Sequence, residues 1–176
     1  MTAGFLLFTL AGEGTRTDIW AMSLADRRAG PVLDTIYTEG AAVLSPNGKW
    51  LAYQSDEADR EQVYVQPFDG ITRGTKRRYE ISGQTGGGFP RWRADGKELF
   101  YVTRDGSMMA VSVRSANDDF QSDSPHALFQ TRIAAGIWNL FDVAPDGSRF
   151  LMNVPLEWPN DSPITVMTNW TATIKN

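Results

Sequence analysis

Cysteine is absent from the 176-residue sequence, and histidine occurs once, at His126. Without cysteine the chain has no disulfide, no thiolate nucleophile and no zinc–thiolate site. We also expect no serine-hydrolase triad within the chain, because no G-x-S-x-G motif occurs and the one histidine follows Pro125 at the expected start of an outer strand. The sequence therefore predicts no catalytic residue, and we interpret His126 as an ordinary surface or edge residue.

Excess positive charge and long apolar runs are lacking as well. The formal net charge is -4 and the isoelectric point is near 5.0, whereas a phosphate backbone demands a basic surface. The one concentrated positive run, RGTKRR at 73–78, is interpreted as a solvated loop. The apolar stretch at 5–10 lacks the positive leader of a signal peptide, and no segment approaches the roughly 20 apolar residues of a membrane span. We therefore expect neither nucleic acid binding nor direct membrane insertion.

Three acidic or glycine-rich segments lack the spacing that a metal or cofactor site requires. The stretch SDEADRE at 55–61 has no EF-hand ligand order and fits a solvated hairpin connection. Asp118 and Asp119 are adjacent, so on a strand they point to opposite faces and do not form a glycosidase pair. The glycines at 86–88 are followed by neither lysine nor a helix start, and we expect them to give the chain room to pass between repeats. The sequence thus predicts no metal and no cofactor.

What the sequence does contain is a repeat. SPNGKWLAYQSDE at 45–57 returns as RADGKELFYVTRD at 93–105 and as APDGSRFLMNVP at 144–155, so that the turn glycines are 48 and 51 residues apart. Each glycine is followed by a short apolar and aromatic run of strand length, and then by a second such run. The same two-strand signature occurs at 5–9 and 19–24, which gives a fourth copy. This spacing lies at the long end of the period of propeller blades.

The recurring turn has the residue types that a tight hairpin needs. In Pro46-Asn47-Gly48 and Pro145-Asp146-Gly147, proline fixes φ at the first corner, Asn or Asp tolerates the second, and glycine takes the positive φ that closes the turn. Ala94-Asp95-Gly96 has the same pattern without proline. We therefore interpret each copy as a structural corner between two antiparallel strands.

Each copy also carries weaker signals for an inner strand before the turn and an outer strand after the second run. Inner strands are expected at 42–44, 89–92 and 140–143, and outer strands at 33–37, 78–81 and 127–130. Four short antiparallel strands in each unit, without a convincing amphipathic helix, favour an all-β partial β-propeller of about four blades, with a β-sandwich as the alternative. The expected blades are residues 4–38, 40–82, 88–130 and 137–170, the first and last incomplete.

Two of these units, LSPNGKWLAYQSDEADREQVYVQPFDG and FPRWRADGKELFYVTRDGSMMAVSVRS, resemble the repeats of TolB-like, WD-repeat-like bacterial β-propellers. The resemblance covers nearly the whole chain. The end of the sequence, SPITVMTNWTATIKN, is similar to the C-terminal portion of propellers fused to bacterial serine/threonine kinases or transcriptional regulators. Asn47 in place of Asp, Arg93-Ala94 in place of Ser-Pro and the insert at 155–163 depart from the family pattern and alter loops more than blades. The resemblance implies a periplasmic or other extracytoplasmic location.

The two end units are shorter than the middle ones. The first begins at its second strand and the last stops after its third, so an open arc leaves apolar sheet faces at both ends. We therefore expect the C-terminal part of a larger bacterial propeller. The alternative is a homo-dimer in which two arcs close one ring.

Six tryptophans are many for this length. Trp20, Trp50 and Trp92 fall within strand signatures and are interpreted as core packing between blades. Trp138 and Trp158 lie near predicted loops, where an aromatic side chain meets a partner. In the four-strand scheme the loops after the second strand and the blade-to-blade crossings share one face. The partner-binding face predicted on this basis consists of Asp56, Arg60, Arg104, Trp138 and Trp158.

Two functions compete on this evidence. The favoured one is a non-catalytic module that binds a protein or peptide as part of a larger bacterial protein. The second is a regulatory or accessory propeller of an enzyme, such as a serine/threonine kinase or a prolyl-type peptidase, whose chemistry resides in another domain. A sugar or small-molecule ligand is a third alternative, because aromatic loops also hold carbohydrates.

Overall fold

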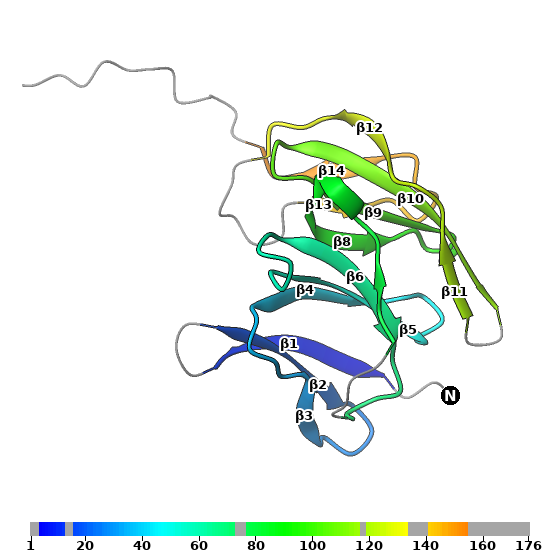
Figure 1. Ribbon diagram of the computed structural model, residues 1–176. Coiled ribbons are helices and arrows are strands. Elements are labelled where there is room, and N and C mark those ends of the chain that lie inside the picture. The colour runs from blue at the N-terminus through cyan, green and yellow to red at the C-terminus, as the bar shows by residue number, and fades with distance from the viewer. Residues whose placement is uncertain (1–3, 13–15, 73–76, 117–118, 134–140, 155–176) are drawn as a thin grey trace, which may run out of the picture.

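The computed structural model of the protein describes residues 4–12, 16–72, 77–116, 119–133 and 141–154 (Figure 1). Within these ranges the chain is built from antiparallel β-strands, with one short 3-10 turn at Gly83–Thr85. The strands form separate sheets that follow one another in chain order and are stacked face to face (Figure 1). None of these sheets closes on itself. The expectation of an all-β partial propeller is confirmed.

The sheets have three, four, five and two strands within the described ranges. The first has the order β1 (Phe5–Ala11), β2 (Thr17–Ser23), β3 (Ala29–Leu33). The second has the order β4 (Glu39–Leu44), β5 (Trp50–Ser55), β6 (Gln62–Pro67), β7 (Tyr79–Glu80). In the third, β8 (Gly88–Trp92) and β9 (Glu98–Val102) precede β10 (Ser107–Ala116), and β10 pairs with both β11 (Asp119–Ser122) and β12 (His126–Gln130). The fourth consists of β13 (Phe141–Val143) and β14 (Phe150–Met152).

The repeated glycine turns join the strand pairs β4–β5, β8–β9 and β13–β14, as predicted. Gly48, Gly96 and Gly147 have φ values of 71°, 70° and 75°, which are left-handed conformations that glycine adopts without strain. The Asn or Asp before each glycine also forms a hydrogen bond, which the sequence analysis did not predict. Its side-chain Oδ1 accepts a hydrogen bond of 3.0 Å from the backbone N–H two residues later, at Lys49, Lys97 and Ser148. This Asx-turn bond explains why only Asn or Asp occupies the position.

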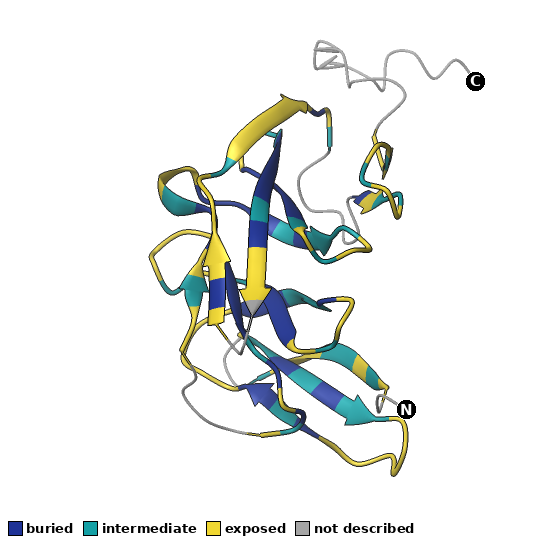
Figure 2. Ribbon diagram, turned by 90° about the vertical axis from the view of Figure 1, so that its right-hand side faces the viewer, coloured by how far each residue is buried: buried dark blue, intermediate teal, exposed yellow. Residues whose placement is uncertain are grey.

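Strand residues that face a neighbouring sheet form three buried clusters. Between the first and second sheets the buried residues are Ile19, Ala21, Val32, Leu33, Leu51, Tyr53, Tyr64 and Phe68. The interface between the second and third sheets buries Trp50, Ala52, Val63, Val65, Ile81, Leu99, Tyr101, Met109, Val111, Val113 and Phe120. Between the third and fourth sheets the buried residues are Phe100, Val102, Met108, Ala110 and Phe141. Burial is therefore concentrated on the strand faces between sheets, whereas the loops and β12 are exposed (Figure 2).

The predicted roles of the strand tryptophans are confirmed for two of the three. Trp50 is buried between the second and third sheets, with its ring 5.0 Å from that of Phe120, and Trp92 packs against the same cluster. Trp20 is different, because it lies on the face of the first sheet that points away from the second sheet. There it is half-buried and contacts Phe8, with a ring separation of 6.4 Å.

The outer strand predicted at 33–37 is wrong. The outer strand of the first sheet is β3, which ends at Leu33, and residues 34–38 form an irregular crossing to β4. Proline at 31 is compatible with an edge strand, and the Thr35 hydroxyl accepts the Tyr37 N–H at 3.0 Å, which bends the crossing. The outer strands of the next two sheets are confirmed as β7 and β12, while β11 was not predicted. The blade boundaries stay predictions, and Asp118, Trp138 and Trp158 lie outside the described residues.

Candidate partner-binding site

Loops and crossings meet at one end of the stacked sheets. The β5–β6 loop (56–61) bonds to the β3–β4 crossing through Asp56 and Thr38. The same loop bonds to the β7–β8 crossing, because the Gly87 N–H donates to the Glu61 carbonyl at 2.9 Å. The β9–β10 loop lies on the same side of the stack as the β5–β6 loop (Figure 1). We call residues 34–38, 56–61, 81–87 and 103–106 the loop face.

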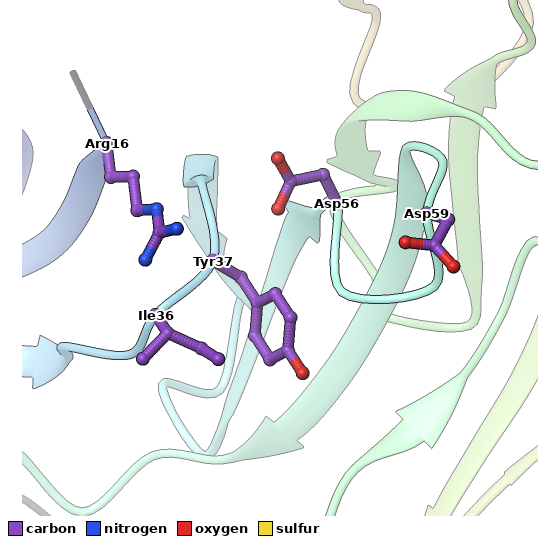
Figure 3. Close-up of a pocket in the computed structure, with 5 residues that line it drawn as sticks. All are labelled: Arg16, Ile36, Tyr37, Asp56 and Asp59. Atoms are coloured by element: carbon purple, nitrogen blue, oxygen red, sulfur yellow. The ribbon is translucent and has the colours of Figure 1, made fainter. Parts of the chain in front are cut away.

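A cleft of about 310 Å³ opens on this face between the β3–β4 crossing and the β5–β6 loop. Its walls carry an arginine, two apolar side chains and two carboxylates, contributed by Arg16, Ile36, Tyr37, Asp56 and Asp59 (Figure 3). The apolar side chains are in contact with solvent, with Ile36 66% and Tyr37 37% exposed. The cleft therefore combines uncovered apolar surface with charged groups, as recognition surfaces do.

The charges of the cleft are separated along its length. Figure 3 shows Tyr37 lying between Ile36 and Asp59, with Arg16 at the opposite end from Asp59. Asp56 Oδ1 accepts the Thr38 N–H at 2.8 Å, which fixes that carboxylate. Within the described part of the chain neither Asp56 nor Asp59 forms an ion pair. Asp59 also has a φ of 59°, an uncommon conformation that the tight β5–β6 loop imposes. Two carboxylates thus line the cleft without an ion-pair partner among the described residues, and Figure 3 shows Asp56 between Arg16 and Asp59.

A third carboxylate, Glu39, is buried beside the cleft wall and is only 2% exposed. Its Oε1 accepts a hydrogen bond from the Thr35 hydroxyl, and its Oε2 has no hydrogen-bond partner within the described residues. Because Thr35 also accepts the Tyr37 N–H, one hydroxyl joins Glu39 to the cleft wall. Burial raises the pKa of Glu39 to about 7, and the negative charges of Asp18 and Asp56 act in the same direction.

Glu39 departs from the repeat. Gly87 occupies the corresponding position in the third sheet. Glu39 immediately precedes the bulge of β4 at Gly40–Val43, and Gly87 immediately precedes the bulge of β8 at Gly88–Arg91. A Cβ on Gly87 would lie only 2.5 Å from the ring of Tyr101, so the third sheet has no room for a side chain there. The fold therefore does not require a carboxylate at this position, and its burial in the second sheet points to a role other than packing.

A third acidic residue of the β5–β6 loop, Glu57, forms an ion pair. Arg78 Nη1 lies 2.6 Å from Glu57 Oε2, and the Arg78 guanidinium lies 5.6 Å from the centre of the Tyr64 ring. Burial raises the pKa of Tyr64 to about 12 and raises the pKa of Tyr53 above its usual range. Glu57 is therefore neutralised within the fold, in contrast to Asp56 and Asp59.

The structure brings together some of the sequence-predicted residues. Asp56 lines the cleft, and Arg60 lies in the same loop with its guanidinium 3.5 Å from the Gly83 carbonyl. Arg104 is exposed in the corresponding loop of the third sheet and is not a cleft residue. Trp138 and Trp158 lie outside the described residues. The grouping of the predicted five as one binding face stays a prediction.

Sequence reasoning missed the residues Ile36, Tyr37 and Glu39. The first two were assigned to an outer strand, although Asp34 before them is a poor strand residue and favours a turn. For Glu39 the available signal was the alignment of the repeats, in which it stands where the next copy has glycine.

Other predicted features have definite places in the structure. His126 is the first residue of the outer strand β12 and is exposed, as expected. The glycines at 86–88 lie where the chain crosses from the second sheet to the third, which confirms their spacing role. Within the described ranges, no cluster of three or more His, Asp or Glu side chains is arranged to hold a metal ion. The same ranges contain no helix long and apolar enough to cross a membrane.

No protein-family model and no curated protein matches the sequence. Solved structures do match. TolB from Acinetobacter baumannii is 17% identical with a TM-score of 0.52, over 83% of this chain and 34% of TolB. A protein assigned as TolB from Agrobacterium tumefaciens is 15% identical with a TM-score of 0.51, over 67% of this chain and 44% of that one. A protein assigned as a 6-phosphogluconolactonase from Bacteroides uniformis is 14% identical with a TM-score of 0.54, over 85% of this chain and 48% of that one.

These matches define the class of fold. The chain has a β-propeller fold and is similar to TolB-type propellers, so the resemblance read from the repeats is confirmed at the level of fold. The chain spans between about a third and a half of the length of these structures. At identities this low the likeness concerns the fold alone and does not carry an activity.

Proposed function

We propose that the chain is a non-catalytic β-propeller module that binds a protein or peptide through its loop face, as part of a larger bacterial protein. The observation that carries this proposal is the cleft, where Ile36 and Tyr37 remain in contact with solvent beside carboxylates that form no ion pair with the described residues. Exposed apolar side chains grouped on loops over a rigid sheet scaffold are typical of recognition sites. The walls are also fixed in place by the bonds between Thr38 and Asp56, which reduces the entropy cost of binding.

An accessory role in an enzyme is the alternative. In that case the chain is the regulatory propeller of a serine/threonine kinase or a prolyl-type peptidase, and the chemistry belongs to another domain. One of the matching structures is assigned as a 6-phosphogluconolactonase, so the propeller fold by itself is compatible with an enzyme. The position of His126 favours the binding role, because the one histidine lies on the exposed outer strand β12 and not among the cleft residues.

Site-specific photo-crosslinking tests this proposal. A benzophenone amino acid is placed at Tyr37 on the loop face, and as a matched control at Lys97, which is exposed in the β8–β9 turn at the other end of the strands. We expect position 37 to crosslink a discrete protein in the native host and position 97 to give no product of that mass. Crosslinking of the same protein from position 97 alone would place recognition on the turn end and contradict the proposal.

A second copy of the chain is a further candidate partner. The face of the first sheet that points away from the second sheet carries Leu6, Phe8, Leu10, Trp20 and Met22. Leu6 is 50% and Leu10 42% exposed. The faces between neighbouring described sheets are covered, whereas this face and the outer face of the fourth sheet, where Leu151 is 79% exposed, are not. A sheet that packed on this face would continue the series of interfaces. We propose that another copy covers it in a homo-dimer that closes the ring.

A further inference from the structure

We propose that the cleft binds a basic side chain, lysine or arginine, presented by a protein partner. The aliphatic stem of that side chain packs on Ile36 and Tyr37, and its positive charge lies beside Asp56 and Asp59. This inference rests on the proposed function of the loop face as a protein-binding surface. It adds the chemistry that the partner must offer.

The apolar wall fits the stem of a long basic side chain. Ile36 and Tyr37 are adjacent in the β3–β4 crossing, and both line the cleft with much of their surface uncovered. Lysine and arginine bury their methylene groups along such surfaces while the charged end stays near water or an acceptor. The face of a tyrosine ring also attracts a cation. An aromatic and an aliphatic group in the cleft therefore favour an organic cation over a small hydrated metal ion, which requires several oxygen ligands.

The charges select a cation and set its direction. Asp56 and Asp59 both line the cleft, and neither is ion-paired within the described residues. The hydrogen bond from the Thr38 N–H to Asp56 Oδ1 orients that carboxylate before any ligand arrives. Arg16 lies at the other end of the cleft and repels a positive group there (Figure 3). The cation of the partner is therefore directed away from Arg16, towards Asp59, with Asp56 between them (Figure 3).

Glu39 provides an independent observation beside the cleft, which it does not itself line. Its carboxyl is almost completely buried and one of its oxygens has no hydrogen-bond partner among the described residues, although the third sheet has glycine at the corresponding position. It is tied to the Tyr37 backbone through Thr35 and lies within electrostatic range of Asp56. When ionised, Glu39 adds negative potential behind the wall that the cation contacts. Burial of an ionised carboxyl is energetically unfavourable. A contribution to cation binding explains why the chain keeps Glu39 at this position.

An NMR titration of the full chain with blocked peptides tests the inference. The probe is Ac-Gly-Gly-Leu-Arg-Leu-Gly-Gly-amide, and the matched controls replace arginine by citrulline, which has nearly the same shape without the charge, or by glutamate. We expect the arginine peptide to shift the amide signals of Tyr37, Thr38 and Asp59 in a saturable manner. The citrulline peptide is expected to bind about fivefold or more weakly, and the glutamate peptide to leave these signals unchanged.

Matched variants locate the charge that is recognised. D56N keeps the Oδ1 that accepts the Thr38 N–H, and D59N changes only an exposed loop carboxylate. We expect each to weaken arginine-peptide binding about three- to tenfold, and E39Q to weaken it about twofold. D119N, which neutralises an exposed carboxylate on β11, serves as the control and is expected to leave binding unchanged.

Two results would overturn the inference: equal affinity for the arginine and citrulline peptides, or equal binding by D59N, D56N and D119N. Its failure is distinguishable from failure of the proposed function. If the partner crosslinked at position 37 is captured equally well by D56N and D59N, the loop face binds protein without recognising a cation. If position 37 yields no crosslinked partner while the arginine peptide binds, the cleft selects cations and the protein-binding function is wrong.

Discussion

Thr38 and Asp56 are joined by two hydrogen bonds that run in opposite directions. The Thr38 N–H donates to Asp56 Oδ1 at 2.8 Å, and the Asp56 N–H donates to the Thr38 carbonyl at 3.3 Å. One residue belongs to the crossing from the first sheet to the second, and the other to the β5–β6 loop. The pair therefore fixes the two walls of the cleft relative to each other.

Replacement of Asp56 separates its structural role from its charge. D56A loses the acceptor for the Thr38 N–H, and we expect the free energy of unfolding to fall by about 1 kcal/mol. D56N retains an equivalent oxygen and is expected to stay close to the wild type. Urea denaturation of the three proteins measures the difference. Equal stability of D56A and D56N would show that the bond does not hold the cleft.

Glu39 makes stability depend on pH. Burial raises its pKa from 4.5 to about 7, so between these values the folded chain keeps a proton that the unfolded chain releases. The contribution of Glu39 to the free energy of unfolding is therefore most favourable below pH 4.5. It falls as the pH rises towards 7 and stays low above pH 7. The total loss is on the order of 3 kcal/mol, at about 1.4 kcal/mol per pH unit.

The variant E39Q removes this penalty because a glutamine amide carries no charge. We expect E39Q to be more stable than the wild type near pH 8, and the difference to be much smaller near pH 5. Thermal unfolding at both pH values measures it. If the difference in stability between the wild type and E39Q is the same at both pH values, Glu39 does not titrate as described.

Trp50 and Trp20 are predicted to differ in their contribution to stability, although both lie in strands. Trp50 is buried between two sheets, with ring contacts to Phe120 and Tyr79, so W50A is expected to cost about 3–5 kcal/mol. Trp20 is half-buried on the uncovered face of the first sheet, so W20A is expected to cost less than half of that. Denaturant unfolding of both variants provides the comparison. A larger loss for W20A would contradict the assignment of the two sheet faces.

The uncovered face of the first sheet predicts self-association. Charged residues at Leu6 and Leu10 would oppose burial of this face, so we expect the L6K/L10K double variant to shift the chain towards the monomer. L24K is the matched control, because Leu24 is 58% exposed but lies in the β2–β3 loop and not on that face. Sedimentation equilibrium over a range of concentrations measures the association. A wild type that is monomeric throughout would rule out the homo-dimer.

The sheets could be predicted from the sequence because their signals are local and repeated. Gly48 and Gly96 mark positive-φ corners, and the apolar runs after them have strand length, so each hairpin specifies itself. The crossing at 34–38 was misassigned because Ile36 and Tyr37 have high strand propensity. Their conformation depends on side-chain bonds from Thr35 and Asp56, which a propensity does not include.

The cleft could be predicted only in part for a related reason. Asp56 was identified from its place in a loop, but Ile36 and Tyr37 belong to the crossing between the first and second sheets, and their proximity to Asp56 depends on how these sheets stack. Glu39 resembles any other charged residue in the sequence, and only three-dimensional packing shows that its carboxyl is buried and that one of its oxygens has no partner among the described residues. The repeat pattern predicts the strands, but it does not predict the burial of an individual side chain such as Glu39.

Hydrogen–deuterium exchange of the chain with and without its crosslink-identified partner tests most directly whether the loop face is the recognition surface. We predict increased protection of the amides at 34–38 and 56–61, where the cleft walls lie, and unchanged exchange at the turns 45–49 and 93–97. Protection confined to those turns, with exchange at 34–38 and 56–61 unaltered, would contradict the account.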